Sequence, residues 1–108
     1  MTPEAVIKLS KALGDPTRFR ILQAIAATEE IACGALAARF PITQATCSQH
    51  LKVLKDARLV RDRRAGKQRI YSVDAIGLGA FRAELDQFWS KALAVYKAAV
   101  EDPSKEVL

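Results

Sequence analysis

Residues 43–60 read TQATCSQHLKVLKDARLV, and this stretch has the pattern of one amphipathic helix that ends near Ala57–Arg58. Thr43 is a good N-cap, and Cys47, Leu51 and Leu54 recur at the three- and four-residue spacing of a buried helical face. With about 100° of rotation per residue, the opposite face holds polar and small side chains. These outward residues, with two that flank them near the N-terminus, are Gln44, Ala45, Thr46, Ser48, Gln49 and Lys52.

Three shorter helices are predicted before this stretch. Residues 3–13 carry one apolar stripe at helical spacing. Asp15 and Pro16 then begin a second helix, as its N-cap and its first helical residue. After a polar break, a short third helix is predicted from Ala32 to Arg39.

A hairpin and a long helix are predicted after it. Leu59–Arg64 and Arg69–Val73 have the composition of strands, and the glycine between them suits a tight turn. Asp74 caps a last helix that continues to about Glu101. The fold class is therefore mainly α with a small β-hairpin, a winged helix-turn-helix, and the large apolar face of the last helix makes it an expected dimeric one. We expect one domain over residues 1–102, for both DNA binding and dimerisation, and a flexible C-terminal tail over 103–108.

The positive charge of the chain is concentrated at the end of this helix and in the predicted hairpin. The 108 residues carry a net charge of +5. Positions 52–69 hold eight Lys or Arg and two Asp, so this stretch alone carries +6 and the rest is nearly neutral. One local basic patch is typical of a surface that binds phosphates.

Together these elements predict a protein that binds duplex DNA. A helix about 10–12 Å across fits the major groove of B-DNA, which is about 12 Å wide. Gln side chains can pair with adenine edges, and Ser, Thr and Lys can bond bases or phosphates. Arginines at a hairpin tip can bind phosphates or enter a narrow minor groove. The predicted hairpin would be the wing of this fold. The candidate phosphate contacts, in the wing and at the start of the second helix, are Thr17, Arg18, Arg63, Arg64, Lys67 and Arg69.

Other classes of protein find little support. The sequence has no recognisable nucleophile–base pair and no phosphate-cradling glycine loop, so we predict no catalytic residues and no enzyme activity. No apolar run approaches the roughly 20 residues that span a bilayer, and the N-terminus has no signal-peptide core. We therefore expect a cytoplasmic protein without a membrane partner. A protein-interaction module that uses this fold without DNA is an alternative, and the basic patch argues against it.

Three runs of the chain resemble one known family. They are LSKALGDPTRFRILQAI at 9–25, the 43–60 stretch, and RRAGKQRIYSV at 63–73. Together they are similar to the arsenic-repressor (ArsR) family of bacterial transcription factors, over roughly residues 5–90. The resemblance implies a homodimeric repressor that binds an inverted-repeat operator in double-stranded DNA. Family members usually release DNA when an inducer binds, and the inducer here is unknown.

The resemblance also implies that the first and last helices form the dimer interface. The residues agree, because the last helix has more apolar face than a lone small domain needs. The alternative is that this face only covers the domain's own core. The candidate interface residues are Val6, Leu9, Phe81, Leu85, Phe88, Trp89, Leu93 and Tyr96.

Metal-sensing members of the family carry ligand motifs that this chain lacks. Where the arsenic and cadmium type has Cys-Val-Cys, this chain has Ala32-Cys33-Gly34. Where the zinc and nickel type opens its last helix with Asp-x-His, this chain has Asp74-Ala75-Ile76, and it contains a single histidine. We therefore predict no metal site and no cofactor. The stretch LDQFWSKALAVYKA at 85–98 instead resembles a branch without metal, the SdpR-like branch.

The two cysteines allow three interpretations, one of which is a metalloid site with a third ligand that the sequence does not identify. Cys33 and Cys47 lie on the inward stripes of neighbouring helices, which suits small core residues. The third is a thiol switch, responsive to oxidation or sulfide, in which bridging of the pair distorts the DNA-reading helix. That alternative requires Cα atoms within about 7 Å and some access to solvent.

Overall fold

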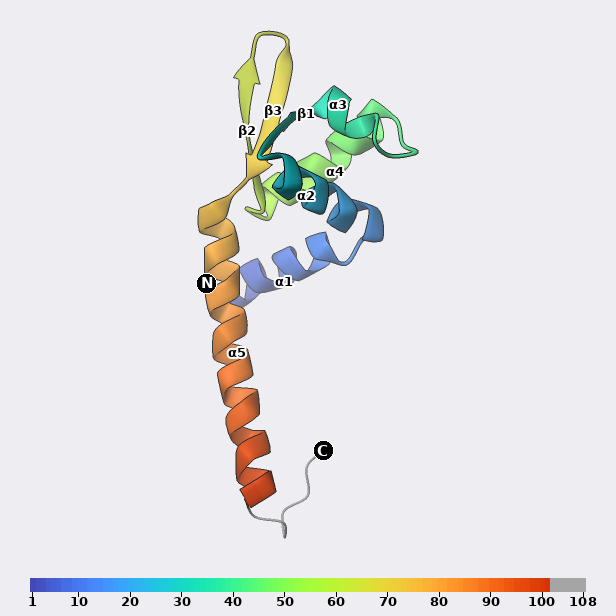
Figure 1. Cartoon of the computed structure of the whole chain (residues 1–108). Helices are drawn as coiled ribbons and strands as arrows, with labels where there is room; N and C mark the ends of the chain where they lie inside the picture. The colour runs from blue at the N-terminus through green and yellow to red at the C-terminus, as the bar shows by residue number, and fades with distance from the viewer. Residues whose placement is uncertain (102–108) are drawn as a thin grey trace.

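A helical body with a three-stranded sheet along one side carries a long terminal helix that extends away from it (Figure 1). The computed structural model describes residues 1–101. The extended last helix makes the molecule 64 Å long and only 26 Å wide. The elements in chain order are α1 (Pro3–Leu13), α2 (Pro16–Thr28), β1 (Glu30–Ala32), α3 (Cys33–Ala37), α4 (Gln44–Asp56), β2 (Val60–Ala65), β3 (Gln68–Val73) and α5 (Ala75–Glu101).

The long helices begin at side chains that cap them. Thr2, Asp15 and Thr43 accept hydrogen bonds from backbone N–H groups in the first turns of α1, α2 and α4, at 3.1, 2.9 and 3.1 Å. Asp74 accepts the N–H of Gly77 at 3.0 Å at the start of α5. A cap supplies an acceptor for one of the N–H groups that a helix leaves free. The helix starts predicted at Asp15, Thr43 and Asp74 are confirmed.

The sheet contains the predicted hairpin and one further strand. β2 and β3 are antiparallel and turn at Gly66, whose φ of 62° favours glycine. β1 pairs with the other edge of β3, with Ala32 opposite Ile70. The prediction of a helix from Ala32 to Arg39 is therefore wrong at both ends: Ala32 belongs to the strand, and α3 ends at Ala37. A three-residue strand is too short to show a period of two, so its pairing with β3 is the only sign of it.

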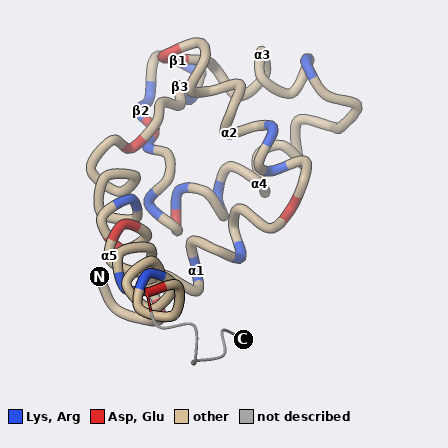
Figure 2. The backbone as a smooth tube through the Cα atoms, turned by 60° about the horizontal axis from the view of Figure 1, so that its bottom comes forward, with Lys and Arg blue, Asp and Glu red and all other residues tan. Residues whose placement is uncertain are grey.

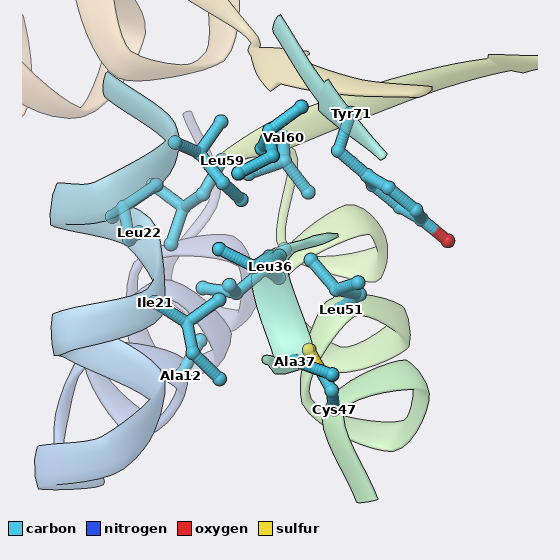
Figure 3. Close-up of a cluster of buried hydrophobic side chains, with 14 of the residues drawn as sticks. Ala12, Ile21, Leu22, Leu36, Ala37, Cys47, Leu51, Leu59, Val60 and Tyr71 are labelled. Atoms are coloured by element: carbon cyan, nitrogen blue, oxygen red, sulfur yellow. The ribbon is translucent and has the colours of Figure 1, made fainter. Parts of the chain in front are cut away.

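The core lies where α1 to α4 meet the sheet (Figure 3). Cys47, Leu51 and Leu54 of α4 are all fully buried, as their spacing predicted. Burying this stripe fixes which side of α4 faces solvent. The other buried members are Leu9, Ala12, Ile21, Leu22, Ile25, Ile31, Leu36, Ala37, Ala57, Leu59, Val60 and Tyr71.

The helix α5 contributes little to this core. Gly77 is its one buried residue, and Leu78 and Phe81 pack against the core from outside. Farther along, α5 leaves the body (Figure 1). Its large apolar side chains there are exposed. Within residues 1–101, no helix is both long and apolar enough to cross a membrane. The tail predicted over 103–108 lies outside the described residues.

Candidate nucleic-acid interface

The outward face of α4 carries the predicted base-reading residues. Gln44, Ala45, Ser48, Gln49 and Lys52 are exposed, because the opposite face of the helix is packed into the core. Thr46 is half-buried, and its hydroxyl accepts a 3.0 Å hydrogen bond from that of Thr43. The first two turns of α4 thus present amide and hydroxyl groups, with one ammonium group a turn farther on.

The hairpin β2–β3 stands beside the N-terminal half of α4. A groove of about 360 Å³ separates them, with Gln44 and Ser48 on one wall and Lys67 and Arg69 on the other. The basic patch on α4 and along the hairpin can be followed in blue in Figure 2. The structure therefore brings predicted base-reading and phosphate-binding residues to one surface. The remaining lining residues are Ala32, Cys33, Gly34, Gln68 and Tyr71.

The arginines on the two faces of the hairpin have different partners. Arg63 donates to Glu30 across β3, with its closer N–O distance at 2.9 Å, and this bond lowers the pKa of the Glu30 carboxyl. Arg64 and Arg69 are opposite each other in the register, and alternation along a strand places them on the other face. The Arg64 side chain is exposed, and its Nε donates to the Gly66 carbonyl at 3.3 Å. Arg64 is therefore better placed than Arg63 to reach a phosphate near α4.

One carboxylate links the wing to α4, which the sequence analysis did not predict. Asp62 accepts from Lys55 Nζ at 2.8 Å and from Arg69 at 3.2 Å, and its side chain is only 9% exposed. The bond to Lys55 lowers the pKa of Asp62 against the opposing effect of burial. The available signal was that Asp62 is one of two acids in the basic stretch 52–69. The result is an ion-pair bridge from the end of α4 to both strands of the wing.

The start of α2 is tied to its neighbours. Arg18 donates to the carbonyl groups of Ala12 at 2.7 Å and Lys11 at 3.1 Å, and its guanidinium lies 3.5 Å from Nδ1 of His50. Thr17, next to it, is half-buried. Arg18 thus joins the end of α1 to α2 and α4, so fewer of its donors are free for a phosphate than the sequence suggested. Contacts of Thr17 and Arg18 with DNA stay predictions.

Comparisons with known proteins identify the family of this chain. Residues 13–63 match a family model described as a helix-turn-helix domain. The HTH-type transcriptional regulator Rv2034 of Mycobacterium tuberculosis is 46% identical over 91 residues, which cover 84% of each chain. The arsenical resistance operon repressor of Staphylococcus xylosus is 33% identical over 80% of this chain and 82% of its own. The chain belongs to the ArsR family of transcriptional regulators.

Other ArsR-family comparisons agree with the fold. The transcriptional repressor SdpR of Bacillus subtilis is 38% identical over 59% of this chain and 70% of its own, in line with the predicted branch. A solved structure from Mycobacterium bovis is described as a homodimeric winged helix-turn-helix DNA-binding domain and a possible ArsR-family regulator. It matches with a TM-score of 0.66 and 27% identity, over 82% of this chain and 81% of its own.

In this ArsR-family chain the two cysteines lie together between α3 and α4. Cys47 is fully buried and Cys33 half-buried. Burial raises the pKa of both thiols, that of Cys47 to about 11. A thiol with a raised pKa is rarely a thiolate at neutral pH and so reacts slowly. These facts favour the role of core residues over a thiol switch. Among residues 1–101, no three His, Cys, Asp or Glu side chains gather where they could hold a metal.

The exposed apolar surface of this ArsR-family protein is on α5. Phe88, Trp89, Leu93 and Tyr96 are each more than half exposed. Leu9, predicted to lie in the dimer interface, is instead only 2% exposed and belongs to the core, so it has almost no surface to offer a partner. Val6 and Phe81 are half-buried and Leu85 is exposed. Three further large apolar residues of α5 are exposed and were not predicted for the interface: Ile76, Val95 and Val100.

Proposed function

We propose that this chain is a transcriptional repressor that binds an inverted-repeat operator in double-stranded DNA as a homodimer. The observation that carries the proposal is the groove between α4 and the wing. Its walls place Gln44 and Ser48 opposite Lys67 and Arg69, and the last two belong to the basic stretch 52–69. Such a pairing of base-directed and phosphate-directed groups suits a helix in a major groove and a hairpin over the adjacent backbone.

The chemistry of α4 fits base edges. The amide groups of Gln44 and Gln49 can donate to N7 and accept from N6 of adenine, which is the bidentate pairing that adenine offers in the major groove. Lys52 suits guanine or a phosphate. The N-terminus of α4 also carries the positive end of the helix dipole, and that end favours the approach of a phosphate. Arg64 and Lys67 then supply phosphate contacts from the wing.

The apolar stripe on α5 supplies the reason for a dimer. Phe81, Leu85, Phe88, Ala92 and Val95 repeat at alternating intervals of four and three residues, the spacing at which two helices pack along a common seam. A second copy is the occupant we propose, since a monomer rarely leaves so large an apolar face in water. The related Mycobacterium bovis domain is described as homodimeric. Two α4 helices in such a dimer contact half-sites about one helical turn apart.

Relatives of the chain that are named as repressors support this role. An inverted repeat within a promoter, when occupied by a dimer, excludes polymerase from the same DNA.

Selection of tight-binding duplexes from a random library tests the proposal. The 108-residue protein should enrich an inverted repeat with half-site centres about 10 base pairs apart. A mobility-shift titration should then show affinity for that duplex roughly a thousandfold or more above that for random DNA. Failure to enrich any sequence, with no binding beyond that to random duplex, would contradict the proposal and favour a protein-interaction module instead.

A further inference from the structure

The first turn of α5 is seated directly on the turn that ends α4. Arg58, the second residue after α4, has a φ of 61°, a left-handed conformation that is uncommon outside glycine. The next residue, Leu59, is fully buried, and its carbonyl accepts the N–H of Asp74 at 3.0 Å. Asp74 in turn caps α5 by accepting the N–H of Gly77 at 3.0 Å. These contacts form a junction, made of Arg58, Leu59, Asp74 and Gly77, between α4 and α5.

Gly77 has no room for a side chain at this junction. A Cβ atom built on it would overlap the carbonyl oxygen of Arg58 and would lie 2.9 Å from the carbonyl carbon. The obstacle is backbone, and it cannot swing aside as the end of a flexible side chain does. Gly79, two residues farther along the same helix, has nothing within 4 Å of its Cβ position. Position 77 therefore requires glycine for steric reasons, whereas position 79 does not.

The length of α5 amplifies any change at the junction. Relieving the overlap needs a displacement of roughly 1 Å within a turn of 5.4 Å, which is a tilt of about 10°. At the far end of a 27-residue helix, about 40 Å long, that tilt becomes a shift of roughly 7 Å. A shift of that size is about two base pairs of B-DNA, where ten base pairs span about 34 Å.

We propose that Gly77 is a positioning residue for DNA recognition. It lets α5 seat on the end of α4, and the junction thereby fixes the distance and angle at which a dimer presents its two α4 helices to DNA. The inference rests on the proposed function, in which α5 pairs with a second copy and α4 enters the major groove. Gly77 itself touches no DNA: it acts through the backbone of Arg58.

Gly77→Ala tests the inference, with Gly79→Ala as the matched control for adding the same methyl group to the same helix. The binding sites are duplexes selected by the wild-type protein, prepared as a single half-site and as inverted repeats whose half-sites are moved apart or together one base pair at a time. Gly77→Ala should bind the single half-site like wild type. It should bind the wild-type spacing roughly 10- to 100-fold more weakly, because simultaneous engagement of both half-sites is lost. Its best spacing should shift or broaden, while Gly79→Ala keeps the wild-type profile.

A second pair of variants covers the case in which Gly77→Ala does not fold. Asp74→Ala removes the cap that holds the first turn of α5 and adds no clash, whereas Asp74→Asn keeps a capping side chain. Asp74→Ala should broaden the spacing preference, and Asp74→Asn should restore it. If Gly77→Ala has the same spacing profile as wild type, the inference is overturned. If Gly77→Ala is unfolded, a wild-type spacing profile of Asp74→Ala overturns it instead. If wild type neither dimerises nor binds any selected duplex, the proposed function itself fails, and that result is distinguishable from failure of the inference.

Discussion

Arg63 and Arg64 are neighbours on β2, and the structure gives them different surroundings. Arg63 is paired with Glu30 on the face of the sheet away from α4, whereas Arg64 lies on the face that carries the bridge to α4. An ion pair already made must be weakened before its arginine can bind a phosphate. The two residues should therefore contribute unequally to DNA affinity.

Arg64→Ala should weaken binding to all duplexes alike and should lower the slope of log K against log salt concentration by about 0.9. Arg63→Ala should change the slope less. Lys97→Ala removes one positive charge from α5, far from the wing in the chain, and serves as the control. Fluorescence anisotropy titrations on operator and random duplex at several salt concentrations measure these slopes. Identical slopes for Arg64→Ala and wild type would remove the wing from the interface.

Counting charges predicts the basic patch, but it does not predict which of its arginines form ion pairs within the protein and which can bind phosphate. Arg63 and Arg64 have the same side chain and adjacent positions, so composition and local pattern cannot separate them. Their difference depends on the pairing register of β3 with both neighbours and on the presence of Glu30 in β1. That strand is three residues long and is recognisable only from its partner.

Among the elements, α4 and the wing are held together by Asp62. Its carboxylate bridges Lys55 at the end of α4 and Arg69 on β3, and most of its side chain is shielded from water. Because the pKa of Asp62 is lowered in the folded protein, folding is stabilised by the ionised form. That contribution is fully present above the ordinary carboxyl pKa and is lost as pH falls through the lowered folded-state value.

Asp62→Asn should therefore be less stable than wild type at neutral pH, and the difference should shrink as the pH falls from about 5 towards 2. Urea unfolding at stepped pH measures the free energy of unfolding of both proteins. Asp86→Asn, on an exposed aspartate of α5, controls for the loss of one carboxylate. A constant difference between Asp62→Asn and wild type over this pH range would show that the bridge does not depend on ionised Asp62.

Element boundaries followed from local chemistry wherever a cap or a turn residue was present. Asp15, Thr43, Asp74 and Gly66 marked their positions correctly because each acts on its own neighbouring backbone. The end of α3 has no such mark, and the prediction to Arg39 extended it two residues too far. The Asp62 bridge joins residues seven positions apart on each side, and no local rule predicts it.

The whole molecule is a small body with a long helix whose apolar side chains face water. Phe88 is 60% exposed in the middle of the α5 stripe, and the exposed Gln87 is rotated about 100° from it around the helix, off the stripe. A charge placed in an apolar seam is costly, whereas one on the solvent face is not. The two positions therefore provide a matched pair for testing the dimer.

Phe88→Glu should convert the dimer to a folded monomer and should weaken operator binding by roughly 100-fold or more, because the second half-site is no longer tethered. Gln87→Glu adds the same charge at the residue next to Phe88, and this variant should remain a dimer. Sedimentation velocity gives the oligomeric state, and far-ultraviolet circular dichroism checks the fold. A Phe88→Glu protein that sediments as a dimer would rule out the α5 seam.

Sequence patterns predicted the apolar excess of α5, but they did not predict which apolar helix residues are buried in the core and which are exposed. Leu9 and Phe88 are both apolar residues at helical spacing, yet one is enclosed by its own chain and the other is not. The difference arises because α1 buries Leu9 and Ala12 in the core, whereas α5 leaves the body after its first turns (Figure 1). Only the tertiary arrangement distinguishes a core stripe from an interface stripe.

The most direct measurement removes single acceptor atoms from the major groove. In the selected operator, each adenine or guanine is replaced in turn by its 7-deaza analogue, which lacks N7 and keeps Watson–Crick pairing. Wild type should lose about 1 kcal/mol at one or more positions in each half-site, and Gln49→Ala should be insensitive at one of them. Equal affinity of the wild-type protein for every substituted duplex would show that α4 does not lie in the major groove.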